Sequence, residues 1–140
     1  MLTVCSGSSI DQQSNNASLF NLVEQINVPA GAGVPPGGVV PLEIHAYWQL
    51  EPEEVGRDFW LRFVMLATSG LETSSNPHRH RVVSPRFRTR SVGLPYPPVI
   101  GGYSLRADWK FDDEEEWQRA AAAWPVRIHV VEQIADRVTH

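Results

Sequence analysis

The chain has 140 residues, of which 42% are hydrophobic and 20% are charged, and its formal net charge at pH 7 is -4. This balance excludes a disordered protein, and the lack of an apolar run of about 18 residues excludes a membrane-spanning helix. Eleven Pro and ten Gly predict many turns and short strands. We therefore expect one mainly β domain over residues 1–140, with helix as the minority element.

Cys5 is the only cysteine, so no disulfide can form within the chain. A single thiol favours a reducing compartment, and residues 1–10 lack the basic start and long apolar run of a signal peptide. We therefore expect a cytoplasmic protein. Eleven Arg against the single Lys110 are typical of a bacterial genome rich in G and C.

The first half of the chain predicts four strands. Leu2–Ile10 is a short candidate, and Ser18–Val28 is a longer one that Glu24 interrupts, where we expect a bulge or an edge. A loop rich in Pro and Gly follows over Pro29–Pro41. Leu42–Leu50 alternates most regularly, with its even positions apolar, so a register slip of one residue would bury Glu43. Phe59–Ala67 is apolar on both faces apart from one Arg, as a central strand would be.

The second half predicts three more strands. Arg86–Val92 is a short candidate, and a Pro-rich loop follows over Gly93–Gly102. Tyr103–Phe111 alternates almost as regularly as Leu42–Leu50, and Val126–Val130 ends the pattern. About seven strands with turn signals between them indicate a single antiparallel β-sandwich, immunoglobulin-like or C2-like.

One short helix is expected near residues 112–124. Asp112 or Asp113 can cap its start, with Glu115 placed as in a capping box. The spacing of Trp117, Ala120, Ala121 and Trp124 is that of one helical stripe, and Pro125 ends the segment.

The chain resembles an uncharacterised bacterial family of short β-sandwich proteins. The resemblance lies in Ser18–Leu22 with Glu24–Ile26, the Pro- and Gly-rich loop, the strand ending at Tyr47-Trp48, and Gly101-Gly102-Tyr103 at the start of a late strand. It implies a sandwich fold, a cytoplasmic bacterial setting and no known cofactor, with no catalytic motif to carry over. It also implies that the predicted helix is a local addition.

Charge is segregated along the sequence. The stretch Thr73–Ala107 contains six Arg and no Asp or Glu, so all sixteen carboxylates lie outside it. If Phe87 faces the core, then Arg86, Arg88 and Arg90 project together from one face, about 6–7 Å apart. Such a row attracts phosphates or an acidic protein surface. Exposed strand faces are commonly charged, so the row is also typical of a solvated face of cross-strand ion pairs, with Glu43, Asp108 or the Glu51 and Glu53 pair as partners.

His78 and His80 share a face if their segment is extended, and His-x-His is a recurrent half of a zinc or iron site. A third ligand is missing nearby, and the cations Arg79 and Arg81 repel a metal ion. His45, His129 or Asp108 could complete the site only if the fold brings them close. Surface histidines are the alternative.

No pattern in the sequence anchors enzyme chemistry. Cys5 could be a nucleophile with a distant His, but a single Cys in an opening strand is typically a small buried residue. We therefore expect a non-enzymatic protein-interaction module without a cofactor, whose Arg-rich face binds an acidic partner protein. The alternative is an anion or nucleic-acid binder, and a His-based metal-dependent hydrolase is the third hypothesis. The expected binding residues are Arg86, Arg88, Arg90, Arg79, Arg81, His78 and His80.

Overall fold

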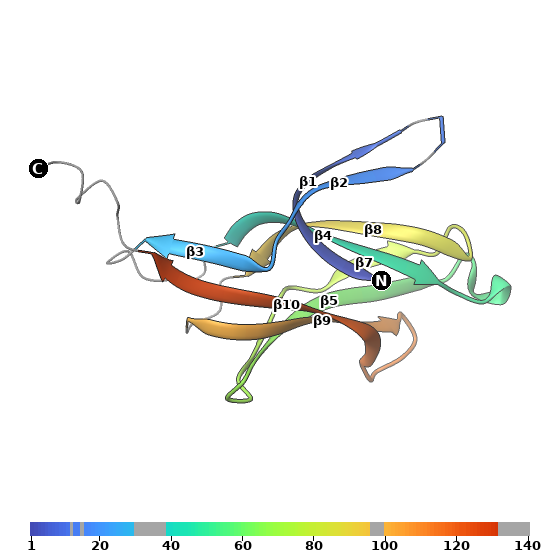
Figure 1. Ribbon diagram of the computed structural model, residues 1–140. Helices are drawn as coiled ribbons and strands as arrows, with labels where there is room; N and C mark the ends of the chain where they lie inside the picture. The colour runs from blue at the N-terminus through green and yellow to red at the C-terminus, as the bar shows by residue number, and fades with distance from the viewer. Residues whose placement is uncertain (12, 15, 30–38, 96–99, 132–140) are drawn as a thin grey trace, which may run out of the picture.

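The protein is mainly β, as predicted. The computed structural model describes residues 1–11, 13–14, 16–29, 39–95 and 100–131 (Figure 1). The strands in this part are β1 (Leu2–Ile10), β2 (Ala17–Leu22), β3 (Gln25–Pro29), β4 (Val39–Gln49), β5 (Asp58–Ala67), β6 (Glu72–Ser74), β7 (His78–Arg81), β8 (Arg86–Pro95), β9 (Gly101–Phe111) and β10 (Gln118–Val131). A single 3-10 turn, η1, spans Pro52–Glu54. No helix in the described ranges is long and apolar enough to cross a membrane.

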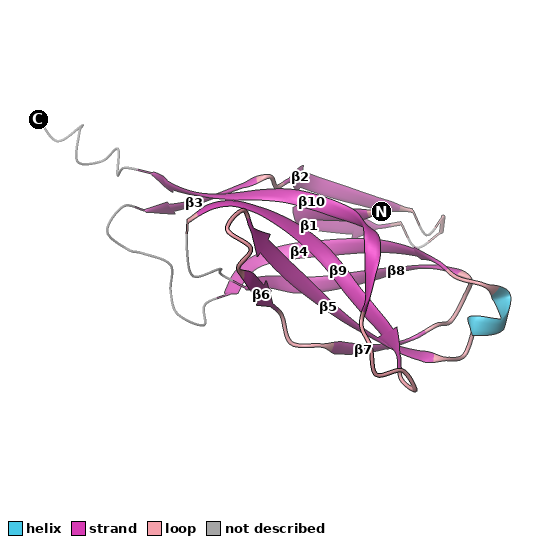
Figure 2. Cartoon of the chain, turned by 90° about the horizontal axis from the view of Figure 1, so that it is seen from below, coloured by secondary structure: helices cyan, strands magenta, loops and turns pink. Residues whose placement is uncertain are grey.

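The strands form two sheets that stack as a β-sandwich (Figure 2). The four-stranded sheet has the order β2-β1-β4-β8, and the six-stranded sheet has the order β3-β10-β9-β5-β6, with β7 also pairing with β5. Val4 and Ile44 from the first sheet and Leu61 and Leu105 from the second are all fully buried. They belong to one core cluster between the sheets, as the alternating pattern of the sequence requires.

The two most regular predicted strands are β4 and β9. Their inward side chains face the core as expected: Ile44 and Leu105 have 0% exposure, and Trp48 and Trp109 are partly buried against it. Glu43 and His45 of β4 were predicted to face outward, and they do lie on the outer face, but they are only 8% and 2% exposed. They are covered because β1 lies beside them and its Ser8 reaches the Glu43 carboxylate.

The predicted strand Ser18–Val28 is two strands. The chain leaves the four-stranded sheet after β2 and enters the six-stranded sheet as β3, which pairs in parallel with β10. Asn21 takes a left-handed φ of 54°, a conformation that Asn tolerates better than most residues. Trp124 then holds the crossing point, because its indole Nε1 donates to the Val23 carbonyl at 2.6 Å. Glu24 thus marks a change of sheet and not a bulge.

The predicted helix over residues 112–124 was wrong. Residues 112–117 form the turn of a hairpin, and β10 starts at Gln118, opposite Trp109 of β9. The carboxylates expected to cap a helix bind across strands instead: Asp112 accepts from the Trp60 indole and Asp113 from Arg57.

The apolar spacing that suggested a helix fits a bulged strand. The register of β10 against β9 shifts between Arg119 and Ala123, so three residues of β10 lie opposite one residue of β9. Ala120 and Ala122 pack against the core, and Trp124 does so beyond the bulge. Trp117 instead lies under the cations of Arg62 and Lys110, 4.3 and 5.2 Å from its ring. The two indoles therefore face different surroundings.

The other boundaries agree with the sequence within a few residues. β1 spans Leu2–Ile10, β5 has partners on both sides, and β8 continues to Pro95. Most of the predicted loop Pro29–Pro41 and residues 96–99 of the predicted loop Gly93–Gly102 lie outside the described residues.

Candidate functional site

The outer face of β8 carries the arginine row. Phe87 points inward, where its ring meets Phe59 edge-on at 5.6 Å and packs against the core. The neighbours of Phe87 along β8 therefore project to the opposite side. Arg86, Arg88 and Arg90 share this outer face, as the alternation predicted.

The adjacent strand β4 continues the same surface. In the register of the two strands Gln49 lies opposite Arg86, Tyr47 opposite Arg88, and His45 opposite Arg90. Tyr47 is 36% exposed, so its ring is accessible to solvent next to Arg88. The sequence places Tyr47 on the outer face of its strand but does not reveal its neighbour, because register between distant strands is set by the whole sheet.

A cleft of about 1030 Å³ opens over this face. Its lining includes Arg86, Arg88 and Arg90 of β8, Tyr47 and His45 of β4, and Ile10, Asn16 and Ala17 from the far part of the β1–β2 hairpin. In Figure 1 the far part of this hairpin rises away from β4 and β8. The lining, taken over the described residues, contains no Asp or Glu. The cleft is therefore cationic.

Glu43 lies beside the cleft and holds one of its arginines. Arg90 donates to both carboxylate oxygens, through Nε at 2.7 Å and Nη2 at 3.1 Å. Ser8 donates to Oε1 at 2.6 Å, and the imidazole Nε2 of His45 lies 2.9 Å from the same oxygen. The hydrogen bond from Arg90, followed by that from Ser8, lowers the pKa of Glu43 to about 2. Because the ionised carboxylate only accepts hydrogen bonds, Nε2 of His45 carries a proton.

The three arginines are therefore not equivalent. The cross-strand ion pair expected with Glu43 is formed by Arg90, whose pKa is raised by the hydrogen bond to that carboxylate. Arg86 is exposed, and its guanidinium has no hydrogen bond or ion pair within the described part of the chain. Arg86 is thus the cation of the row with the least internal compensation.

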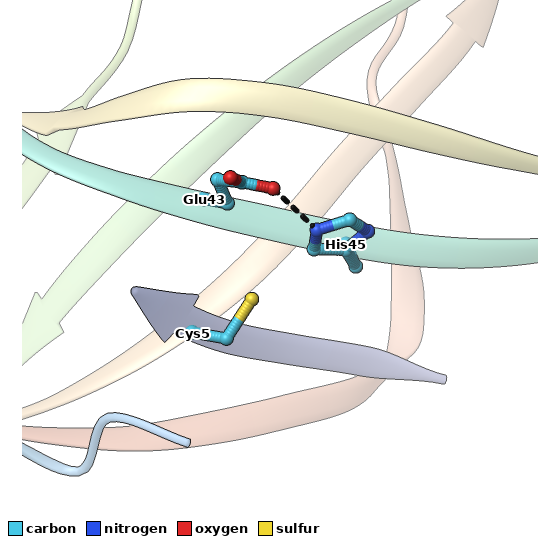
Figure 3. Close-up of side chains that lie close together, drawn as sticks. All are labelled: Cys5, Glu43 and His45. Carbon is cyan, nitrogen blue, oxygen red and sulfur yellow. Dashed lines mark hydrogen bonds and ion pairs between the residues drawn. The ribbon is translucent and has the colours of Figure 1, made fainter. Parts of the chain in front are cut away.

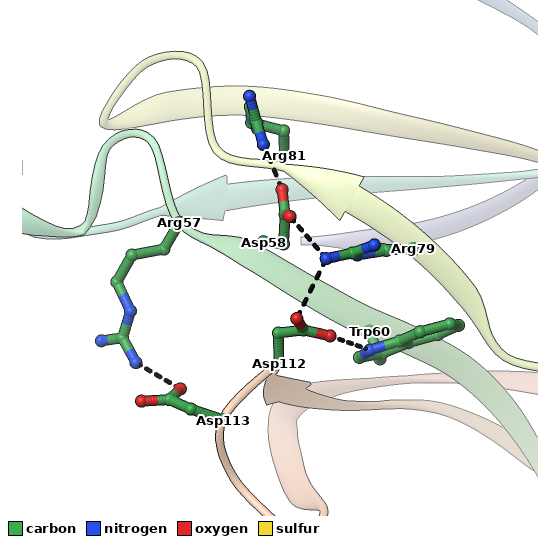
Figure 4. A network of polar contacts seen from close by, with 7 residues as sticks. All are labelled: Arg57, Asp58, Trp60, Arg79, Arg81, Asp112 and Asp113. Atoms are coloured by element: carbon green, nitrogen blue, oxygen red, sulfur yellow. Dashed lines mark hydrogen bonds and ion pairs between the residues drawn. The ribbon is translucent and has the colours of Figure 1, made fainter.

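Arg79 and Arg81 lie on the other sheet. They project from β7 on the outer face of the six-stranded sheet, opposite Trp60 and Asp58 of β5. Figure 4 shows the network they join: Arg79 donates to Asp58 and Asp112, and Arg81 donates to Asp58. These two arginines are neutralised locally, so they do not extend the cationic cleft.

His78 and His80 also lie on β7, away from the cleft. His80 stacks on Phe59 with ring centroids 5.4 Å apart, and its Nε2 is a buried nitrogen without a hydrogen-bond partner among the described residues. Burial, with a contribution from His78, lowers the pKa of His80. Within the described ranges, neither His78 nor His80 belongs to a group of three side chains that could hold a metal ion.

A different trio could hold a metal ion. One donor atom each from Cys5, Glu43 and His45 lies within 4.8 Å of the others, and all three residues are buried (Figure 3). The carboxylate in this trio already accepts bonds from Ser8, His45 and Arg90, so an ion would compete with a neighbouring cation. Cys5 has 0% exposure, which leaves its thiol without access for a substrate. The trio fits a buried polar network better than a metal centre.

Fold and site together describe a two-sheet β protein with a cationic cleft on one outer face. No protein-family model and no curated protein matches the chain. The resemblance to a bacterial family of short β-sandwich proteins stays a hypothesis, and an assignment of function depends on the geometry of the cleft.

Proposed function

We propose that this protein is a non-enzymatic interaction module that binds an acidic segment of a partner protein in the cleft beside β8. The observation that carries the proposal is the cleft wall built by Arg86, Arg88 and Arg90, in a lining that has no carboxylate among its described residues. Cations gathered on one side of a concave surface raise the local concentration of anions, because field lines concentrate in a hollow with walls of low dielectric constant.

Shape favours a segment over a flat acidic surface. The cleft, at about 1030 Å³, is at the upper end of the range of small-ligand pockets, and it lies between the sheet and a hairpin. A peptide chain enters such a space more readily than a convex protein surface does. Guanidinium groups recognise carboxylates with two parallel hydrogen bonds each, which gives the site orientation as well as charge.

The setting that we propose is a cytoplasmic one, and the fold class within the sandwich family is immunoglobulin-like or C2-like. The setting is supported by the single cysteine, which lies buried in β1. The fold class is supported by two stacked sheets of mainly antiparallel strands.

The test uses a fluorescent peptide of about ten glutamates, which in extended form matches the ten residues of β8. We expect its fluorescence anisotropy to rise on binding and the affinity to fall at least tenfold between about 0.05 and 0.5 M salt. Arg86→Glu/Arg88→Glu should weaken binding about a hundredfold or more, because each of the two lost charge-assisted contacts contributes about 1.5–3 kcal/mol. Arg90 is left intact because its loss would unpair the Glu43 carboxylate.

The matched control is Arg119→Glu/Arg127→Glu. Both arginines are exposed on β10 of the other sheet, and the net charge changes by the same amount as in the cleft variant. We expect this control to bind the peptide nearly as well as the wild type. Equal losses in the two variants would mean that overall charge alone attracts the peptide, and the proposal would then be wrong.

A second candidate, nucleic-acid binding, is favoured by one observation. The exposed ring of Tyr47 lies opposite Arg88, and an accessible aromatic ring next to arginines is the arrangement on which unpaired bases stack. A labelled oligothymidine in the same assay separates the candidates. Binding that is lost in Tyr47→Ala and exceeds that of the glutamate peptide would replace the first proposal with this one.

A further inference from the structure

Among the described strands, β8 has the longest free edge. It pairs with β4 on one side, and no described residue pairs with its other side. β8 has ten residues, whereas the other edge strands β2, β3, β6 and β7 have six, five, three and four. A free edge presents unpaired backbone N–H and C=O groups, and natural proteins usually keep such edges short.

From this edge we propose a binding mode: the acidic partner segment adds to β8 as an extended strand, with alternate carboxylates facing Arg86, Arg88 and Arg90. The inference rests on the proposed function and specifies how the segment binds: its backbone lies along the free edge of β8, on the side away from β4, and its carboxylates reach the arginine row at the rim of the cleft. Backbone hydrogen bonds to the edge would provide affinity, and alternate side chains would provide specificity, as in other proteins that bind peptides by strand addition.

The spacing of the charges supports this mode. In any strand alternate side chains point to one face, about 6–7 Å apart. An added strand therefore repeats the spacing of the arginine row, and each carboxylate of an alternating sequence lies directly opposite one guanidinium. Cross-strand neighbours of opposite charge stabilise such a pair.

Charge also selects the occupant. A second copy of β8 would place arginine opposite arginine, and like charges directly opposite each other destabilise a sheet. Charged side chains on an edge are a common protection against self-association. The arginine row on β8 would therefore have two effects: it would repel a second copy of β8, and it would attract an acidic strand. Val92, which continues the face and is 62% exposed, would meet an apolar or small residue of the partner.

The test uses the full chain and three peptides of one sequence in which glutamate and valine alternate. The first is unmodified, the second is N-methylated at the glutamates, and the third is N-methylated at the valines. In a strand, the N–H groups of alternate residues point to opposite sides. Strand addition therefore predicts that one methylated peptide loses binding at least tenfold, while the other binds within about threefold of the unmodified peptide.

Amide hydrogen exchange gives a second measurement. On binding of the unmodified peptide, we expect at least tenfold slower exchange at alternate amides between Arg86 and Val92, and no change in the edge strand β2. If both methylated peptides bind as well as the unmodified one, and β8 gains no protection, the segment lies in the cleft without joining the sheet. The strand-addition inference would then be overturned, while the proposed function would stand. Failure of all acidic peptides, polyglutamate included, to bind would overturn the proposed function itself.

Discussion

The two outer faces of the sandwich use the same residue, arginine, in opposite ways. On the six-stranded sheet the arginines of β5, β7 and β9 are paired: Arg62 and Arg106 both bind Asp108, and Arg79 and Arg81 both bind Asp58. On the four-stranded sheet Glu43 is the acid that holds Arg90, and Arg86 has no side-chain partner in the described part of the chain. The arginine–carboxylate network on β5, β7 and β9 is electrostatically closed, and the surface around Arg86 is open to an anion.

This difference shows that a count of charges along the chain does not identify a binding surface. Arg79, Arg81 and Arg106 lie in the acid-free stretch Thr73–Ala107, yet carboxylates from outside the stretch neutralise them. Arg86 stays open because the adjacent strand, β4, presents Gln49 and not a carboxylate at the position opposite it. Cross-strand partners, and not density in sequence, separate a structural arginine from a candidate binding arginine.

Removing Asp108 from the closed arginine–carboxylate network should have the largest effect on the free energy of unfolding. Asp108 is 2% exposed and accepts hydrogen bonds from Arg62 and Arg106, and the Arg106 side chain is 12% exposed. Asp108→Ala leaves these cations without their shared partner, and we expect the free energy of unfolding to fall by about 3–5 kcal/mol. Equilibrium unfolding in urea measures it.

The control for this prediction is Asp113→Ala. Asp113 pairs with Arg57, but its side chain is 77% exposed, so the loss of stability should be much smaller than in Asp108→Ala. Similar losses in both variants would contradict the distinction between a buried and an exposed network.

Substitution of Glu43 should have the second-largest effect on stability, and this effect should depend on pH. Its pKa is about 2 in the folded protein against an ordinary value of 4.5, so its contribution to stability is complete above pH 4.5 and is lost as pH falls towards 2. Glu43→Gln should cost about 1–3 kcal/mol at pH 7, and the gap to the wild type should narrow as pH falls through this window. Urea unfolding at several pH values measures it.

Glu53→Gln is the control for that pH profile, because Glu53 is exposed on the 3-10 turn. It should follow the wild type at every pH. A constant gap between Glu43→Gln and the wild type from pH 7 to pH 2 would show that the carboxylate is not held ionised by its partners.

The alternation of inward and outward residues along a strand could be predicted from the sequence, but the partners of the polar side chains could not. The inward positions of β4 and β9 follow from a period of two, because burial selects apolar residues on one face. The burial of Glu43 and Asp108 could not be read in the same way, since it depends on Ser8, Arg90, Arg62 and Arg106, which reach them from elsewhere in the chain. The segment 112–124 misled for a related reason: alanines and acids favour a helix locally, but pairing with β9 decides the structure.

The candidate site was predictable in part. The arginine row on β8 follows from the inward position of Phe87, which the sequence pattern anticipated. The cleft could not be anticipated, because it depends on where the β1–β2 hairpin lies relative to β8, a matter of tertiary structure. For the same reason the sequence grouped Arg79 and Arg81 with the row, although the fold places them on the opposite sheet.

His80 should give a smaller, pH-dependent effect. Burial and then the nearby His78 lower its pKa from the ordinary 6.5, so the folded protein disfavours its charged form. The unfolded chain then binds the proton first, and stability should fall as pH drops below 6.5 and level off beneath the folded pKa. His80→Phe keeps a ring against Phe59 and should remove this slope in thermal unfolding below about pH 6.5. His129→Phe, at an exposed position on β10, should keep it.

The smallest effect on stability is expected at Arg86, and this one tests the open face. Its exposed side chain has no partner within the described residues, so Arg86→Gln should change the free energy of unfolding by less than about 0.5 kcal/mol. Arg106→Gln on the closed face should cost more, because Arg106 bonds to both Asp108 and Glu72. In the peptide assay the order should reverse, with a loss of affinity in Arg86→Gln and none in Arg106→Gln. An unpaired cation beside a binding cleft should contribute little to folding stability and much to binding. A destabilised Arg86→Gln variant would place Arg86 among the structural arginines instead.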